Sequence, residues 1–252
     1  MEHSVTTLAG DDVKDRVEGF AAGGTLPRAA DVAHPSEARR LRLLVEFGLL
    51  FIGTPLAMHI AVADYHVPLF YALPPLLLAF IAFLLFDPSF SVRQEVRRGV
   101  SRATLVSILA IFVIGSIVVA AFVAEAMPGR LFSLAAERPG MWLGIMTLYP
   151  FLSVLPQEFI YRVFFFHRYG PLFHSRFTLI LTNGLVFGFG HILFRNWIAV
   201  GGSFALGLLF AWRYERTRSF WAVYLEHVLW GWLVFTIGLG VYFFTGVNNP
   251  AW

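Results

Sequence analysis

Apolar residues gather along this chain into long blocks, and short polar segments that carry most of the arginines separate them. A run of about 20 apolar residues is long enough to cross a bilayer as a helix. The pattern therefore predicts an all-α fold, a polytopic membrane helix bundle of about seven to eight transmembrane helices. Seven apolar runs are expected to form it, at residues 41–63, 67–86, 104–124, 141–169, 177–194, 198–212 and 220–244.

The chain divides into two parts by polarity. Residues 1–38 are polar and mixed in charge, which predicts a disordered or loosely helical cytoplasmic tail. Residues 39–252 are expected to form the transmembrane bundle. The run at 141–169 is long and contains Pro156, so it either extends beyond the bilayer or breaks at Pro156 into two helical pieces. One kinked span is favoured, because two passes would invert all later segments and weaken the arginine asymmetry.

Arginines near the ends of the runs predict the orientation. Cytoplasmic segments of membrane proteins carry an excess of Lys and Arg. With the N-terminus inside, twelve arginines fall on the inner side and three on the outer side. We therefore expect an integral protein of a bacterial-type inner (plasma) membrane with a cytoplasmic N-terminus. The inner arginines are Arg39, Arg40, Arg42, Arg93, Arg97, Arg98, Arg102, Arg168, Arg176, Arg213, Arg216 and Arg218, and the outer ones are Arg130, Arg138 and Arg195.

Composition supports this class and excludes others. The chain is 58% hydrophobic and only 14% charged, whereas soluble domains carry about 25% charged residues. Its net charge of +3 comes from the arginines of short loops, so it reflects topology and not nucleic-acid binding. The chain has no cysteine, which excludes disulfides, thiolate metal sites and a cysteine nucleophile. No cleavable signal peptide is expected at its start.

Three polar groups within the apolar runs are the candidates for chemistry. Glu158 and Arg162 lie four residues apart in the fourth run, where buried charges are costly and usually functional. Two later runs each contain a histidine, His191 and His227. In two helices joined by a turn, residues equally far from the turn lie at the same depth. At 1.5 Å per residue, this places each of Glu158, His191 and His227 within roughly 6 Å of the next in depth. The three groups are therefore expected to meet at one level of the membrane.

The neighbours of these groups refine the prediction. Gly188 and Gly190 precede His191, and Gly231 follows His227 by one turn, so we expect open space for a substrate or water beside both histidines. Glu226 is next to His227 but about 100° around the helix, so it is expected to point elsewhere, toward an arginine.

These residues resemble the motifs of the CPBP or Abi family of intramembrane proteases, relatives of the type II CAAX prenyl endopeptidases. The family pattern is Glu-Glu-x-x-x-Arg, then Phe-x-x-x-His, then His-x-x-x-Asn or Asp, on successive helices. Order, spacing and helical context agree over residues 142–235. The three segments here are Gln157-Glu158-Phe159-Ile160-Tyr161-Arg162, Phe187 to His191, and His227 to Gly231. Gln157 thus replaces the first glutamate of the pattern, and Gly231 replaces the Asn or Asp.

The resemblance implies an intramembrane endopeptidase that cleaves a peptide bond at or within the inner half of the bilayer. It implies that Glu158 and His191 activate water, that His227 donates to the oxyanion and that Arg162 orients Glu158. Gln157 takes the position of the usual base, and an amide cannot accept a proton. A glutamate and two histidines could equally hold a divalent metal such as zinc, so Glu158, His191 and His227 are also candidate metal ligands.

Gln157 and Gly231 leave a second function open, a catalytically inactive relative that acts as a membrane scaffold or binds a partner helix. For the protease, the expected partners are a membrane-embedded or lipidated protein or peptide substrate and membrane lipids, with no nucleic acid. Nothing in the sequence indicates recognition of a prenyl group, so the substrate is left unnamed.

Overall fold

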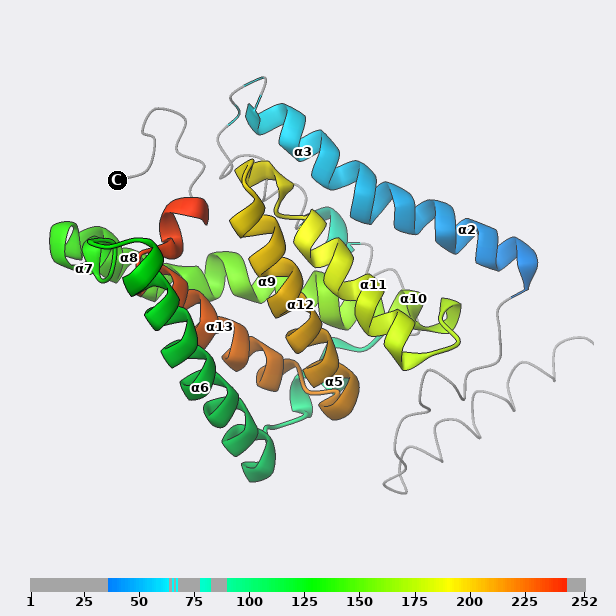
Figure 1. The fold of residues 1–252 in the computed structure, drawn as a ribbon. Coiled ribbons are helices and arrows are strands. Elements are labelled where there is room, and N and C mark those ends of the chain that lie inside the picture. The colour runs from blue at the N-terminus through cyan, green and yellow to red at the C-terminus, as the bar shows by residue number, and fades with distance from the viewer. Residues whose placement is uncertain (1–35, 64, 66, 68–77, 83–89, 244–252) are drawn as a thin grey trace, which may run out of the picture.

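The computed structural model describes residues 36–63, 65, 67, 78–82 and 90–243, and the regular structure of these residues is entirely helical (Figure 1). The predicted all-α class is confirmed. Residues 1–35 of the predicted tail and most of the run at 67–86 lie outside the described residues. The first long helix consists of α2 (Glu37–Gly48), the π-helical turn η2 (Leu49–Gly53) and α3 (Thr54–Ala63).

The fourth apolar run forms one continuous helix of 34 residues, Pro139–Leu172, which is long and apolar enough to cross a membrane and agrees with the prediction of a single helix. Its π-helical turns begin at Pro150 and shortly after Pro156. Proline lacks the N–H of a helical hydrogen bond, and wider turns are one way in which a helix accommodates it. The pieces are α8 (Pro139–Tyr149), η3 (Pro150–Val154), α9 (Leu155–Glu158), η4 (Phe159–Phe164), α10 (Phe165–Tyr169) and η5 (Gly170–Leu172).

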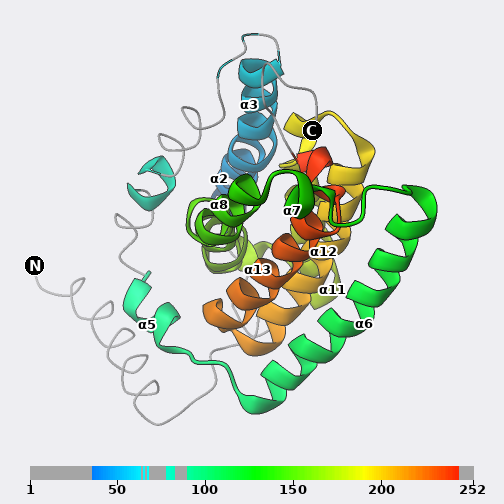
Figure 2. The ribbon, with the colours of Figure 1, turned by 90° about the vertical axis from the view of Figure 1, so that its left-hand side faces the viewer.

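Helix α13 contacts α6, α8 and α12, and α11 packs on α12 (Figures 1 and 2). Ser101, Ser175, Asn196 and Ser219 cap the N-termini of α6, α11, α12 and α13 with their side-chain oxygens. The remaining elements are α5 (Val92–Arg97), α6 (Arg102–Ala126), α7 (Ser133–Glu137), α11 (Arg176–Phe189), η6 (Ile192–Phe194), α12 (Trp197–Thr217), α13 (Phe220–Thr236) and η7 (Leu239–Phe243).

Four helices of the described residues are long and apolar enough to cross a membrane. They support an integral membrane protein, while the predicted count of seven to eight spans is not confirmed. Two later helices are not among them: α13 has 17 residues, and the last turns of α12 carry several charged side chains. The four spans are Glu37–Val62, Arg102–Ala126, Pro139–Leu172 and Arg176–Phe194.

Several of the arginines that were assigned to the inner side lie together where α5, α12 and α13 meet. Arg98 Nη1 donates to the carbonyl of Arg218 at 3.4 Å, and Ser219 Oγ donates to the carbonyl of Arg98 at 3.0 Å. Arg176 pairs with Glu215 at 3.5 Å in the same region. The orientation of the chain in the membrane stays a prediction from the arginine asymmetry.

Candidate functional site

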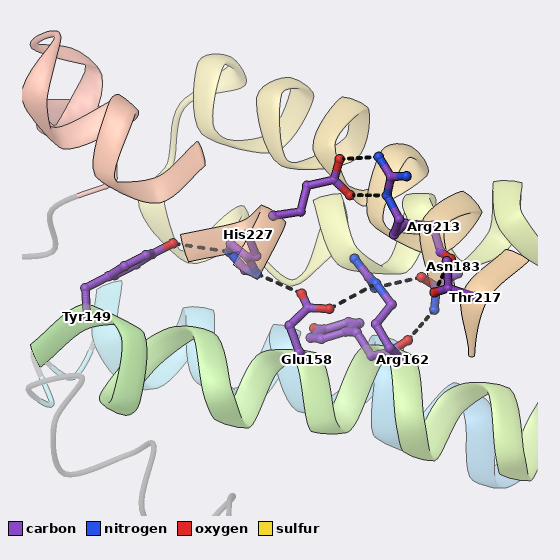
Figure 3. Close-up of polar contacts among 9 residues, drawn as sticks. Tyr149, Glu158, Arg162, Asn183, Arg213, Thr217 and His227 are labelled. Carbon is purple, nitrogen blue, oxygen red and sulfur yellow. Dashed lines mark hydrogen bonds and ion pairs between the residues drawn. The ribbon is translucent and has the colours of Figure 1, made fainter. Parts of the chain in front are cut away.

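Glu158 and His227 form the centre of the site. Glu158 is the last residue of α9 and is 0% exposed, and His227 lies within α13 and is 5% exposed. His227 Nδ1 lies 2.7 Å from Glu158 Oε1, a hydrogen bond that joins the two helices (Figure 3). A buried carboxylate thus has a hydrogen-bonding partner from another helix, which lowers the cost of its burial.

Gln157, the preceding residue, forms its hydrogen bond within its own helix and not with Glu158 or His227. Its Nε2 donates to Ser153 Oγ of the same helix at 2.7 Å, and its side chain is only half-buried. Successive residues of an α-helix differ by about 100°, and a π turn adds one residue to the turn and so changes which residue faces inward. The helix therefore presents Glu158 to the bundle, between the π turns η3 and η4.

Arg162 supports Glu158 from the other side. Its Nε lies 3.5 Å from Glu158 Oε2, and both side chains are 0% exposed. Arg162 Nη1 donates to Asn183 Oδ1 at 2.7 Å, and Asn183 Nδ2 donates to the carbonyl of Tyr161 at 2.6 Å. The guanidinium carbon also lies 4.7 Å from the centre of the Phe187 ring, so the charge is paired, hydrogen-bonded and stacked.

The Phe187 ring contacts both histidines. Its centre lies 4.9 Å from that of His191 and 5.7 Å from that of His227. His191 lies just beyond the end of α11, and its Nδ1 donates to the carbonyl of Phe187 at 2.7 Å. Among the contacts of the described residues, none joins His191 directly to Glu158. The structure therefore brings Glu158 and His227 together. His191 lies against the Phe187 ring, which contacts both histidines.

Tyr149 is a member of the site that the sequence motifs do not include. Its hydroxyl lies 3.2 Å from His227 Nε2, so Tyr149, His227 and Glu158 form one chain of hydrogen bonds (Figure 3). Asn183 was also missed. An uncharged polar residue within an apolar run gives little sequence signal, although Asn183 does lie one helical turn before Phe187.

The expectation of open space beside the histidines is wrong. A Cβ atom at Gly188 would meet Phe204 and the Val200 carbonyl of α12, and one at Gly190 would meet the Tyr161 hydroxyl. Small residues in membrane helices allow neighbours to approach closely, and here the neighbours fill that space.

Gly231 likewise faces a filled space, since a Cβ atom there would overlap the ring of Tyr149.

Glu226 belongs to a separate cluster, as expected from its position on the helix. Arg213 Nε and Nη2 donate to its two carboxylate oxygens at 2.9 Å each, and Arg213 Nη1 donates to Ser107 Oγ at 3.0 Å. This second ion pair joins α6, α12 and α13 beside the site.

The metal prediction is not settled by this geometry. In the part of the chain that the structure describes, no group of three or more His, Asp or Glu side chains is placed to hold a metal ion. His191 and His227 are each anchored through Nδ1, which is how metal-bound histidines are commonly oriented. Metal binding through Glu158, His191 and His227 stays a prediction.

The arrangement suits acid–base chemistry. A carboxylate that accepts from Nδ1 leaves the Nε2 lone pair of His227 available as a proton acceptor. A histidine oriented in this way by a carboxylate is a recurrent general base in hydrolytic sites.

Comparison with known proteins bears on this segment. No curated protein and no solved structure matches the chain. All residues of the site described above fall within one segment, residues 139–233: Tyr149, Glu158, Arg162, Asn183, Phe187, His191, His227 and Gly231. Residues 139–233 match the Rce1-like family model, described as type II CAAX prenyl endopeptidase Rce1-like, and this match confirms the resemblance to a family of proteases.

Proposed function

We propose that the protein is an intramembrane endopeptidase that hydrolyses a peptide bond of a membrane-associated protein at a centre formed by Glu158 and His227. The observation that carries the proposal is the 2.7 Å hydrogen bond between these side chains, within the segment that matches the family. Because His227 contacts Glu158 directly, we assign it as the general base, oriented by the carboxylate. This differs from the sequence prediction, which gave the base role to Glu158 with His191 as its partner.

The proposed reaction balances in two steps. The proton that water loses ends on His227 Nε2, the water oxygen bonds to the carbonyl carbon, and the π pair of the carbonyl moves to its oxygen. In the second step, the pair on that oxygen re-forms the carbonyl, the C–N bonding pair leaves with the nitrogen, and the proton on Nε2 goes to the departing amine. His191 presents an Nε2 acceptor because its Nδ1 proton is held by the carbonyl of Phe187, and we assign it to orient the water.

A peptidase assay on purified protein in nanodiscs tests this function. The probes are membrane-anchored fluorogenic peptides, with and without a lipid chain. We expect Glu158→Gln and His227→Ala to lower the rate by about 10²- to 10⁴-fold. Glu226→Gln is the matched control, because it removes a neighbouring buried carboxylate that is paired with Arg213 and not with His227. An unchanged rate in Glu158→Gln would overturn the proposal.

The alternative is an inactive relative that holds a partner helix. The enclosure of the centre favours it, since Glu158 is fully buried and Tyr149 lies at His227 Nε2. This function predicts that the wild-type protein cleaves none of the peptides and that the variants of Glu158 and His227 behave like the wild type in the assay.

We also propose an inner-membrane location with a cytoplasmic N-terminus, supported by the gathered arginines. The chain has no cysteine, so single cysteines can be introduced at Arg216 and Arg138 and labelled in intact cells with a membrane-impermeant maleimide. The expected result is labelling at 138 and not at 216. Metal analysis after mild purification tests the alternative zinc site: a stoichiometric ion that His227→Ala loses would replace the assignment of His227 as the general base.

A further inference from the structure

Tyr149 occupies the outer end of the hydrogen-bonded chain. It is the last residue of α8 and is partly exposed, whereas His227 is 5% and Glu158 0% exposed. Its ring packs edge-on against His227 and Phe235, with centroid distances of 6.2 and 5.4 Å. Of the three linked residues, Tyr149 is therefore the least buried, and its hydroxyl forms the end of the chain of hydrogen bonds.

The Tyr149 hydroxyl is also hydrogen-bonded to Nε2 of His227, the atom that must accept the proton in the proposed reaction. Glu158 accepts the Nδ1 proton of His227, so Nε2 carries the ring's lone pair. The Tyr149 hydroxyl lies 3.2 Å from this nitrogen and donates to it. A proton from water therefore reaches Nε2 by passing through the phenol oxygen, or the phenol must leave.

Gly231 is what admits Tyr149 to this position. It lies one turn beyond His227 on α13, and a Cβ atom there would overlap the ring carbons and hydroxyl of Tyr149. Any side chain at residue 231 would push the phenol away from His227. The hydrogen bond between Tyr149 and His227 therefore depends on the lack of a side chain at residue 231.

We propose that Tyr149 relays the proton between water and His227. The inference rests on the proposed function. As the water oxygen bonds to the carbonyl carbon, its proton passes to the phenol oxygen while the phenol proton passes to Nε2, so Tyr149 ends unchanged. The reverse transfer delivers the proton to the amine as the C–N bond breaks.

Tyr149→Phe is the sharpest variant, because it keeps the ring and its packing and removes only the hydroxyl. We expect kcat to fall by about 10²-fold with little change in KM. Replacement of Tyr149 by fluorotyrosines of graded acidity separates relay from support, since the rate of a relay follows the acidity of the phenol. A rate within twofold of wild type in Tyr149→Phe, or rates that do not vary among the fluorotyrosines, would overturn the relay.

Gly231→Ala tests the geometry without an activity readout. We expect it to lower the thermal stability of the otherwise wild-type protein through overlap with Tyr149. In a Tyr149→Ala background the same change should cost nothing; an equal loss in both backgrounds contradicts the arrangement.

The two proposals fail in different ways. If the proposed function is wrong, the wild type is as inactive as Glu158→Gln, and the relay falls with it. If only the relay is wrong, the wild type is active, Glu158→Gln is inactive and Tyr149→Phe remains active.

Discussion

Glu158 and His227 lie 69 residues apart in the chain and meet through Oε1 and Nδ1 at 2.7 Å in the interior of the bundle. The carboxylate has Arg162 on its other side, at 3.5 Å. An unpaired carboxylate at this depth would be strongly destabilising. The pairing therefore accounts both for the tolerance of a buried charge and for the orientation of the imidazole.

Arg162 should be costly to remove, because it is fully buried and paired. Arg162→Ala removes the counter-ion of Glu158 and the hydrogen bond that Asn183 Oδ1 accepts. The expected cost is about 3–5 kcal/mol of stability. Thermal unfolding in detergent measures the loss. The exposed Arg138→Ala is the control and should change stability by no more than about 0.5 kcal/mol. Similar losses in the two variants would contradict the supporting role of Arg162.

Glu226 and Glu158 should separate stability from catalysis. Both carboxylates are 0% exposed and paired with an arginine, but only Glu158 contacts His227. Arg213→Ala should destabilise the protein by about 3–5 kcal/mol, because it leaves Glu226 buried and unpaired. The activity of each folded molecule should remain, measured as rate per mole of the monodisperse fraction. If the rate per mole of folded Arg213→Ala fell as far as that of Glu158→Gln, the ion pair of Arg213 and Glu226 would belong to the catalytic site.

Gly188 should tolerate no side chain, because it lies where α11 touches α12. Its Cβ would approach Phe204 Cβ at 2.8 Å and the Val200 carbonyl oxygen at 3.0 Å. Gly188→Ala is expected to cost about 1–3 kcal/mol by overpacking. Gly201→Ala on α12 is the matched control, because nothing lies within 4 Å of its Cβ position. Thermal unfolding that ranks Gly201→Ala as the more damaging change would refute this packing.

Several parts of this arrangement are predictable from the sequence. Glu158 and Arg162 share a helix face at a spacing of four, and Glu226 points away from His227 toward an arginine. The length of the fourth apolar run also agrees with the single continuous helix Pro139–Leu172. These features depend on charge and on helical spacing, and the sequence displays both directly.

Other parts depend on geometry that spacing does not contain. The π turns beside Glu158 change which residue faces inward, so the choice between Gln157 and Glu158 could not be made from a regular helix. Tyr149 joins the site from α8 because Gly231 leaves room for it, and two distant residues had to be considered together to see this. The glycines beside His191 were misinterpreted as open space because the approach of α12 and of the Tyr161 ring cannot be inferred from one helix.

The measurement that tests the central claim most directly is the peptidase rate of Glu158→Gln set against that of Gln157→Ala, in the same nanodiscs and with the same peptide. The structure presents Glu158 to His227 and turns Gln157 toward Ser153. We predict a loss of about 10²- to 10⁴-fold in Glu158→Gln and a rate near that of the wild type in Gln157→Ala. A large loss in Gln157→Ala with Glu158→Gln unaffected would contradict the account.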